Sequence, residues 1–383
     1  MKITLLGTAY PYRGGLAAYN ERLAHEFISE GNIVTIVTFS LQYPSFLFPG
    51  KSQYLDGPAP EGLTITREVN SINPFNWLIV GNRIRKQRPD ILIIKYWLPF
   101  MAPCFGTIAR IARMNKHTRV ITVFDNVIPH EKRPGDKLLT RYYTSAIDGA
   151  IAMSGSVIND LSMFRNDIPA KLNPHPVFDN FGPLIERTKA LTSLGLDTSF
   201  SYLLFFGFIR KYKGLDLLIE AFANENLRNK RLKLLVAGEF YEDDTLYREL
   251  VKKYKLENEI IFFDRFINDN EVAAFFSSAD LVVQPYRSAT QSGVTQIAYH
   301  FGKPMLVTDV GGLREIVPDG KCGYVVNADQ ISISNAIRDY FDNDRKDEFT
   351  GNVIVEKEKY SWGKMTGSIT EVYNKCKSYD NKK

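Results

Sequence analysis

The stretch SYLLFFGFIRKYKGLDLLIEAF, residues 201–222, combines three patterns that decide the fold class. Residues 201–208 are apolar and aromatic, as in a buried β-strand. The loop from Gly207 to Gly214 is rich in glycine and basic side chains, and Leu215–Ala223 has the apolar spacing of a helix. A buried strand, a short loop and a helix form half of a parallel βαβ unit. The stretch therefore predicts an α/β protein with a doubly wound parallel sheet.

The same alternation runs through the rest of the chain. Further strand-like runs lie at 2–7, 33–39, 63–69, 90–97, 119–125, 149–154, 231–238, 259–266, 279–286, 303–310 and 322–326. The stretch LNPHPVFDNFGP, residues 172–183, has three prolines and no periodicity, which is typical of a linker. One core rarely grows beyond about 250–300 residues, so the 383 residues predict two lobes, 1–182 and 183–359.

Residues 360–383 follow the second lobe. Aromatic and aliphatic side chains recur there at roughly helical spacing, which predicts a helix with an apolar stripe. Such a stripe needs a partner, and either lobe could provide it.

The composition is that of an ordinary folded protein. Hydrophobic residues make up 44% of the chain and charged residues 24%, which excludes wholesale disorder. The three cysteines lie far apart without a CxxC pair, which argues against a disulfide framework and favours a reducing compartment. No apolar run approaches the ~18 residues of a membrane span. We expect a cytoplasmic protein, either soluble or peripheral on the inner face of the cytoplasmic membrane.

The net charge of +5 is concentrated in the first half. Residues 1–180 hold 20 Lys and Arg against 14 Asp and Glu, whereas the remainder holds 28 against 29. Nucleic acid is not expected as a partner, because no zinc finger, RNP-type motif or long basic run is present. An anionic membrane surface or a solvated basic face can explain the excess. Basic clusters at 83–88 and 110–119 flank the apolar segment WLPFMAP, residues 97–103, which we predict to be an interfacial wedge.

Three loops that follow predicted strands have residues suited to anion binding. Gly14 and Gly15 precede a helix, where backbone N–H groups and the helix dipole favour an anion. Gly207, Arg210 and Lys213 share one strand-to-helix turn, and the two cations suit a diphosphate. The third loop offers hydroxyl, amide and glycine residues at a helix start: Thr290, Gln291, Ser292, Gly293 and Val294. A plain turn or helix cap is the alternative in each case.

These blocks together resemble the retaining GT-B nucleotide-sugar glycosyltransferases of the bacterial family-4 type. The matching segments are PYRGGLAAYNERLA (11–24), FFGFIRKYKGLDLLIEAF (205–222), FDRFINDNEVAAFFSSADLVVQPY (263–286) and GKPMLVTDVGGLREIVPDGKCGYVV (302–326). The resemblance implies a GT-B fold, with two Rossmann-like lobes facing across a cleft. Residues 1–182 would form the acceptor-side lobe and 183–359 the donor-binding lobe. It also implies that the C-terminal helix, 360–383, packs back on the first lobe.

The resemblance also implies roles for residues at the donor site. Gly15 would approach the donor diphosphate from the first lobe, and Arg210 and Lys213 would bind it from the second. Phe266 and Ile267 would lie near the nucleobase.

In the acceptor-side lobe, the loop after strand 119–125 supplies two further catalytic candidates. Asp125 matches a position of the family pattern. His130 is added on its own chemistry, because a histidine in a polar loop after a strand can hydrogen-bond a substrate hydroxyl or phosphate.

The sequence departs from the family pattern at one place. The family carries two glutamates eight residues apart, which contact donor sugar and ribose, and Ala289 and Ile297 stand at those positions. No acidic residue lies between Tyr286 and Gly302. Gln291 and Gln296 offer neutral hydrogen-bonding replacements.

We therefore expect a glycosyltransferase that moves a sugar from a nucleoside diphosphate-sugar to an acceptor hydroxyl with retention of configuration. A role in cell-envelope polysaccharide or glycolipid synthesis, with a glycan or lipid-linked acceptor, follows from the resemblance. The nucleotide-sugar is a substrate, so no cofactor is expected, and the resemblance implies that no catalytic metal is needed. The alternatives are a nucleotide-sugar epimerase on the same scaffold and a weakly catalytic sugar-nucleotide-binding partner protein.

Overall fold

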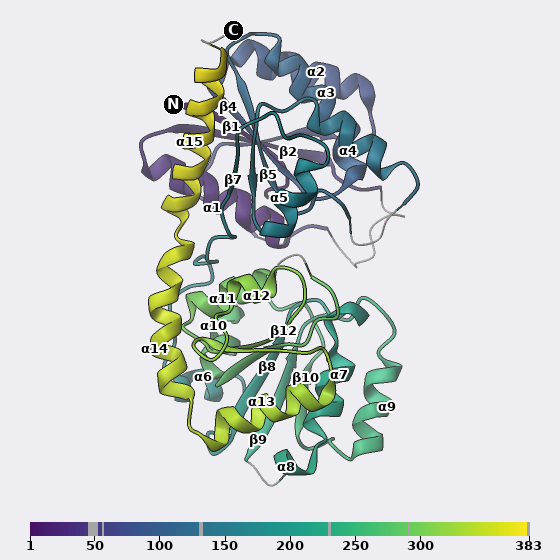
Figure 1. Cartoon of the computed structure of the whole chain (residues 1–383), viewed down its shortest axis with the longest axis vertical. Helices are drawn as coiled ribbons and strands as arrows, with labels where there is room; N and C mark the ends of the chain where they lie inside the picture. Colours follow the sequence, from purple (N-terminus) through teal and green to yellow (C-terminus); the bar gives the residue numbers. More distant parts are fainter. Residues whose placement is uncertain (45–52, 56, 130–132, 229–230, 290–291, 381–383) are drawn as a thin grey trace. The chain divides into compact units, whose positions relative to one another are not determined.

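The structure, a computed structural model, describes residues 1–44, 53–55, 57–129, 133–228, 231–289 and 292–380. The chain divides into two compact units. The first comprises Met1–Pro174 together with Trp362–Lys383, and the second comprises His175–Ser361 (Figure 1). Each unit is an α/β structure with one parallel sheet, so the two Rossmann-like lobes expected of the GT-B fold are present.

The first unit contains a seven-stranded sheet with the order β3-β2-β1-β4-β5-β6-β7, and every pair is parallel. Its inner strands are runs of Ile, Leu and Val that are buried on both faces, as parallel sheets require. The strands are β1 (Lys2–Leu6), β2 (Ile33–Leu41), β3 (Ile65–Asn70), β4 (Ile91–Tyr96), β5 (Arg119–Phe124), β6 (Gly149–Ala152) and β7 (Ala170–Leu172). Successive strands are added on one side of β1 up to β3, and on its other side from β4 onward. The topological switch point therefore lies between β1 and β4.

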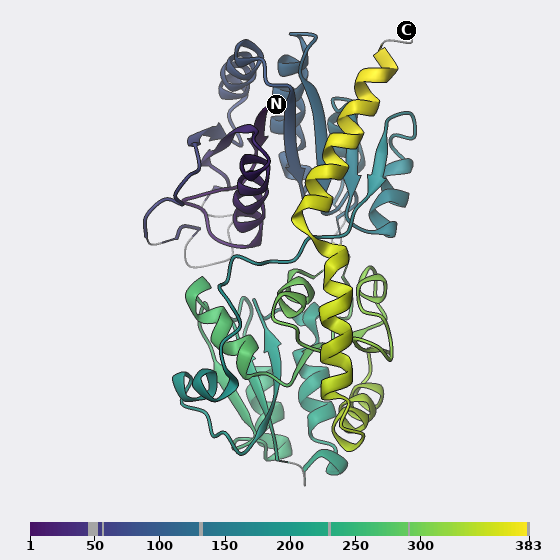
Figure 2. The same cartoon turned by 90° about the vertical axis from the view of Figure 1, so that its left-hand side faces the viewer.

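Helices cover both faces of this sheet. On one face α2 (Pro74–Gln87), α3 (Ala102–Arg113) and α4 (Asp136–Thr144) lie side by side, and α5 (Gly155–Ser162) packs into the same core (Figure 1). On the other face lie α1 (Gly15–Ser29) and the C-terminal α15 (Trp362–Asp380), drawn in purple and yellow in Figure 2.

Helix α15 is held in the first unit by ring packing and hydrogen bonds. The ring of Trp362 lies 5.1 Å from that of Tyr19 on α1. Ser368 Oγ is hydrogen-bonded to Asn173 Oδ1 at 2.9 Å. At β6, a Cβ on Gly149 would lie 2.4 Å from Val372, so glycine is what allows the helix to approach the strand.

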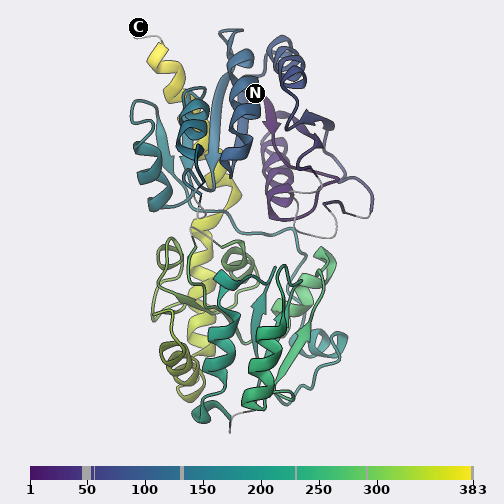
Figure 3. The ribbon, with the colours of Figure 1, turned by 90° about the vertical axis from the view of Figure 1, so that its right-hand side faces the viewer.

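The second unit repeats the architecture with six parallel strands in the order β10-β9-β8-β11-β12-β13. They are β8 (Ser201–Phe206), β9 (Leu232–Ala237), β10 (Ile260–Phe263), β11 (Leu281–Gln284), β12 (Met305–Thr308) and β13 (Gly323–Val326). The helices are α6 (Arg187–Ser193), α7 (Leu215–Phe222), α8 (Glu225–Arg228), α9 (Thr245–Tyr254), α10 (Asp269–Ser278), α11 (Gly293–His300), α12 (Leu313–Ile316), α13 (Gln330–Asp342) and α14 (Lys346–Lys357). Figure 3 views the side on which α7 and α9 lie. Here the switch point falls between β8 and β11.

Two sequence-based expectations need correction. The unit boundary lies after Pro174, not after residue 182, because the following segment packs in the second unit: Val177 N donates to Tyr360 O, and Phe178 packs against Gly293. The expected wedge at 97–103 is not an exposed surface. Pro99 and Met101 are buried. Trp97 Nε1 donates to Tyr43 Oη at 2.8 Å.

Candidate anion-binding site

The turn after β8 brings Gly207 and Lys213 together at the switch point of the second sheet. Gly207 has a φ of 95°, a left-handed conformation that favours glycine. A Cβ at this position would lie 3.2 Å from Lys213 Nζ and 3.7 Å from Val294 Cγ2. The lysine ammonium thus lies against the bare backbone of the turn and beside the first turn of α11.

Lys213 is buried, yet it forms no ion pair with any residue in the described part of the chain. Its side chain lies over Tyr286, with Nζ 5.7 Å from the ring centroid. Burial, together with the smaller effect of the nearby charge of Arg210, lowers the pKa of Lys213 from its ordinary 10.5 to about 8. A buried cation without a counter-ion is costly, so this arrangement is suited to an anionic ligand.

Arg210 begins the same short loop and leads into a row of aromatic rings. Its guanidinium carbon lies 5.0 Å from the centroid of Tyr241. The ring of Tyr241 lies 4.4 Å from that of Phe208, which is 6.2 Å from Phe266. Ile267, next along the chain, is buried. The row therefore offers half-buried ring faces next to the two cations.

Helix α11 begins at the carboxyl end of β11, on the other side of the switch point. Ser292 is its N-cap: Ser292 Oγ accepts a hydrogen bond from Val294 N at 3.2 Å. Tyr286 Oη lies 3.3 Å from the same hydroxyl, which connects the helix start to the ring beneath Lys213. Gly293 and Val294 form the first turn, whose N–H groups favour an anion. Thr290 and Gln291 lie outside the described residues.

The basic loop is fixed to β11 by backbone contacts. Gly214, with a φ of 69°, approaches Pro285 so closely that a Cβ would lie 2.0 Å from its carbonyl oxygen. Arg287 N donates to Tyr212 O at 2.7 Å, and its guanidinium forms two 2.7 Å hydrogen bonds with Asp216 on α7. These contacts hold the cations in place without any ligand.

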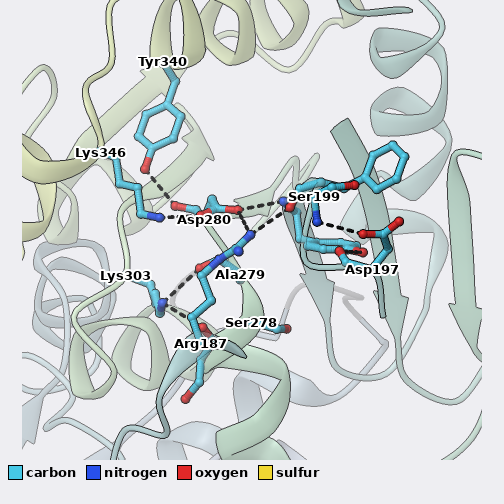
Figure 4. Close-up of polar contacts among 12 residues, drawn as sticks. Arg187, Asp197, Ser199, Ser278, Ala279, Asp280, Lys303, Tyr340 and Lys346 are labelled. Carbon is cyan, nitrogen blue, oxygen red and sulfur yellow. Dashed lines mark hydrogen bonds and ion pairs between the residues drawn. The ribbon is translucent and has the colours of Figure 1, made fainter. Parts of the chain in front are cut away.

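The amino ends of the same strands carry a different buried cluster, shown in Figure 4. Asp280 accepts from Lys346 Nζ at 2.6 Å and from Arg187 Nη2 and Tyr202 N at 2.9 and 2.8 Å. Burial alone would raise the pKa of Asp280, but Lys346 and these donors hold it below its ordinary value. Lys303 Nζ donates to the carbonyls of Ser277 and Ala279. Every buried charge there has a partner, so this cluster is structural.

At the switch point of the first sheet, Gly14 is the N-cap of α1 with a φ of 102° and no side-chain cap. Gly15 opens the helix and is exposed. The first turn of α1 is therefore open to an anion at the carboxyl end of β1.

The carboxyl ends of β4 and β5 hold a buried ion pair. Lys95 Nζ lies 2.8 Å from Asp125 Oδ1 and 3.5 Å from the ring centroid of Tyr19 on α1. The Lys95 side chain is only 2% exposed, whereas that of Asp125 is 22% exposed. Burial lowers the pKa of Lys95, an effect that Asp125 opposes. His130, predicted in the loop after Asp125, lies outside the described residues.

Sequence reasoning missed Lys95 and Tyr286. The signal for Lys95 was a single charged residue inside the apolar run of residues 91–97, because a lysine is rarely buried without a partner. Nothing in the sequence marked Tyr286 as the ring beneath Lys213. At the two positions where the family pattern has glutamates, Ala289 and Ile297 are buried apolar residues.

In the described part of the chain, no three His, Cys, Asp or Glu side chains come together as metal ligands would. None of the described helices is both long enough and apolar enough to cross a bilayer.

The second unit matches a known family. Residues 186–353 match the family model described as glycosyl transferases group 1. An uncharacterized glycosyltransferase of Methanocaldococcus jannaschii is 28% identical over an alignment of 405 positions. The alignment covers 97% of this chain and 98% of that protein. A D-inositol 3-phosphate glycosyltransferase of Catenulispora acidiphila is 26% identical over 60% of this chain. That alignment spans only 56% of the relative's own length.

The fold matches solved structures over nearly the whole chain. Anabaena HepE, solved in complex with UDP and glucose, superposes with a TM-score of 0.72 at 15% identity, covering 98% of this chain and 100% of that one. At this identity the likeness concerns the fold alone. Residues 186–353 are therefore similar to the glycosyl transferases group 1, and the chain has the GT-B fold.

Proposed function

We propose that the chain transfers a sugar from a nucleoside diphosphate-sugar to an acceptor hydroxyl with retention of configuration. The observation that carries the proposal is Lys213, a buried ammonium without a carboxylate partner among the described residues. A diphosphate supplies the missing negative charge. Arg210 and the first turn of α11 provide further positive potential around the same place.

The leaving group decides what these residues do in the reaction. When the bond between the sugar and the diphosphate breaks, negative charge grows on the diphosphate. Lys213, Arg210 and the N-terminal end of α11 at Gly293 stabilise that charge from fixed positions. The aromatic row ending at Phe266 offers ring faces for a nucleobase. HepE, which has the same fold, was solved with UDP, and this supports a nucleoside diphosphate as the ligand.

Retention is proposed from the residues around α11. No acid lies between Tyr286 and Gly302, so this stretch provides no carboxylate nucleophile for a covalent glycosyl-enzyme. A route in which the diphosphate leaves and the acceptor enters on one face of the sugar needs none. The leaving diphosphate itself can accept the acceptor proton.

Asp125 is proposed as the catalytic group of the acceptor-side lobe, with Lys95 as its positioning residue. The ammonium fixes one carboxylate oxygen at 2.8 Å and leaves the side chain partly exposed. We propose a glycan or lipid-linked acceptor and a role in cell-envelope polysaccharide or glycolipid synthesis. His130, Thr290 and Gln291 remain candidates for substrate hydrogen bonds.

Binding of a panel of nucleotides, measured by calorimetry, tests the donor site. One nucleoside diphosphate should bind wild type, and Lys213→Met and Arg210→Ala should weaken that binding at least about tenfold, the loss of one charge-assisted contact. Lys211→Ala is the matched control, because Lys211 is exposed on the same loop. Equal binding by Lys213→Met and wild type would refute the site. Binding without release of nucleoside diphosphate from any sugar donor and acceptor would favour the binding-protein alternative.

Metal independence is a separate part of the proposal. Because Arg210 and Lys213 supply the charge that a metal would otherwise supply, turnover should survive chelation of divalent cations by EDTA. Loss of turnover with EDTA and its recovery with Mg²⁺ or Mn²⁺ would contradict this part alone.

A further inference from the structure

Helix α2 has an outward-facing apolar stripe in addition to the inward one that anchors it. Val80 and Ile84 are buried in the core of the first unit. Phe75, Leu78 and Ile79, on the other side of the helix, are 77%, 50% and 69% exposed. A surface helix normally presents polar side chains outward, and clustered exposed apolar residues mark an interaction surface.

The outward stripe continues into basic residues toward the end of the helix. Phe75, Ile79, Arg83 and Lys86 follow one another at helical spacing. A shallow hollow along the helix is lined by Leu78, Ile79, Asn82, Arg83 and Lys86. Arg83 pairs with Glu68. Lys86 is exposed, and no described residue forms an ion pair with it.

The neighbouring helices repeat this chemistry. Together α2, α3 and α4 carry seven Lys and Arg residues and a single acid, Asp136. On α4, Leu138 is 72% exposed, and Lys137 and Arg141 are exposed beside it. By contrast α1, on the opposite face of the sheet, has two glutamates and one arginine. Seven of the 20 Lys and Arg residues of the first 180 residues thus lie on α2, α3 and α4, which Figure 1 shows side by side. Two of the seven, Arg83 and Arg113, form ion pairs with Glu68 and Asp148.

We propose that this face docks on an anionic phospholipid bilayer. The α2 face, defined as Phe75, Leu78, Ile79 and Lys86, has the two components that an interfacial helix needs. Its apolar side chains enter the boundary between headgroups and acyl chains, and its cation stays at the level of the lipid phosphates. Lys137 and Arg141 on α4 add attraction to the same anionic surface.

The bilayer fits this face better than a protein partner does. Its three large apolar residues are exposed on the outer side of one helix, and α2, α3 and α4 together carry a single acid, so the face complements an extended anionic surface. The inference goes beyond the proposed function and does not depend on it, because the α2 face shares no residue with the donor site. It also differs from the sequence-based expectation, which placed the apolar contact at residues 97–103.

Co-sedimentation with vesicles tests the proposal. The full chain is mixed with vesicles of phosphatidylcholine, with or without phosphatidylglycerol. We expect pelleting only with the anionic vesicles, and release as salt rises from about 0.05 to 0.5 M, because exposed charge is screened. Absence of pelleting with anionic vesicles, or pelleting that salt does not affect, would overturn the proposal.

Two variants and a matched control locate the contact. Phe75→Ser/Ile79→Ser should lower the partition coefficient at least about tenfold, and Lys137→Ala/Arg141→Ala about fivefold for each charge removed. The control, Ile331→Ser/Val355→Ser, changes two apolar residues of the second unit that are 64% and 73% exposed, and it should bind like wild type. Equal loss in control and variant would overturn the assignment to α2.

Two further measurements keep the interpretation specific. Nucleotide binding by Phe75→Ser/Ile79→Ser should equal that of wild type, which shows a folded protein and separates this proposal from the donor site. Sedimentation velocity without lipid should give the same species for both proteins. A wild-type dimer that the double variant dissociates would make the face a self-association surface and overturn the membrane proposal.

Discussion

Each end of the second sheet has a buried lysine, and the two lysines differ in whether the fold provides polar partners for the charge. Lys303, at the amino ends of the strands, and Lys213, at the carboxyl ends, each have a pKa that burial lowers to about 8. Lys303 donates to two backbone carbonyls in the cluster around Asp280 (Figure 4). The ammonium of Lys213 lies over a tyrosine ring and against the bare turn at Gly207, and none of the described residues forms an ion pair with it.

The difference separates a structural group from a functional one. Burial and a shifted pKa are common to both lysines, so neither property identifies the site. What identifies it is the missing partner, because a buried charge must be compensated either within the fold or by a ligand. The position supports this assignment, since ligands of parallel sheets bind outside the carboxyl ends of the strands.

The largest expected effect is a loss of stability on substitution of Asp280, at the amino ends of the strands, where the buried charges are paired. Asp280→Asn leaves Arg187 and Lys346 without their carboxylate and should lower the free energy of unfolding by about 3–5 kcal/mol, as measured by denaturant titration. Nucleotide binding should not change under conditions where the variant is folded. Asp264→Asn, which alters an exposed acid of the same unit, is the control and should have little effect on stability. A stable Asp280→Asn protein would contradict the structural role.

At the carboxyl ends of the strands, Lys213→Met should reduce turnover by ~10²–10³, because it removes one fixed positive charge that stabilises the leaving diphosphate. The same variant should be at least as stable as wild type. A pKa lowered from 10.5 to about 8 corresponds to about 3 kcal/mol of destabilisation at neutral pH. Lys303→Met should gain less stability, since it leaves two carbonyls unpaired. A marked loss of stability in Lys213→Met would show that its charge is compensated within the fold.

The free energy of unfolding should depend on pH through the titration of Lys213. The unfolded chain keeps the Lys213 proton up to about 10.5, whereas the folded protein releases it near 8. Because the unfolded state binds more protons in this window, wild-type stability should gain a contribution from Lys213 as pH rises from 8 to 10.5. Denaturant titrations across this range should show a smaller rise for Lys213→Met. The same rise in both proteins would contradict the assignment.

A smaller effect is expected on ligand affinity. Affinity for the nucleoside diphosphate should fall as pH rises through about 8, by up to about tenfold per pH unit, because Lys213 loses its proton. In Lys213→Arg the guanidinium keeps its charge, so the fall should disappear even if the affinity is lower throughout. A fall of the same size in Lys213→Arg would assign the titration to another group.

Much of the fold could be predicted from the sequence, because buried parallel strands are short apolar runs. All twelve predicted runs overlap strands of the structure, whereas the three-residue β7 was missed. Its sequence, AKL, carries no apolar signal of its own. Arg210 and Lys213 were predictable because strand, loop and helix are contiguous in the sequence.

Features that depend on distant segments could not be predicted. Lys95 contacts Asp125 and Tyr19, which lie 30 and 76 residues away in the sequence. The apolar runs at 97–103 and on α2 are alike in composition, but only packing decides that Met101 is buried and Phe75 exposed. Hydrophobicity indicates that burial of a side chain is favourable. It does not indicate whether the fold buries that side chain.

Direct titration of Lys213 tests the central claim. The side-chain NMR signals of isotopically labelled lysine, with the Lys213 resonance assigned by its absence in Lys213→Arg, give its pKa with and without the nucleoside diphosphate. We predict a pKa of about 8 in the free protein and a higher value in the complex, because the diphosphate stabilises the charged form. An ordinary pKa near 10.5 in the free protein, or one that the diphosphate leaves unchanged, would contradict the account.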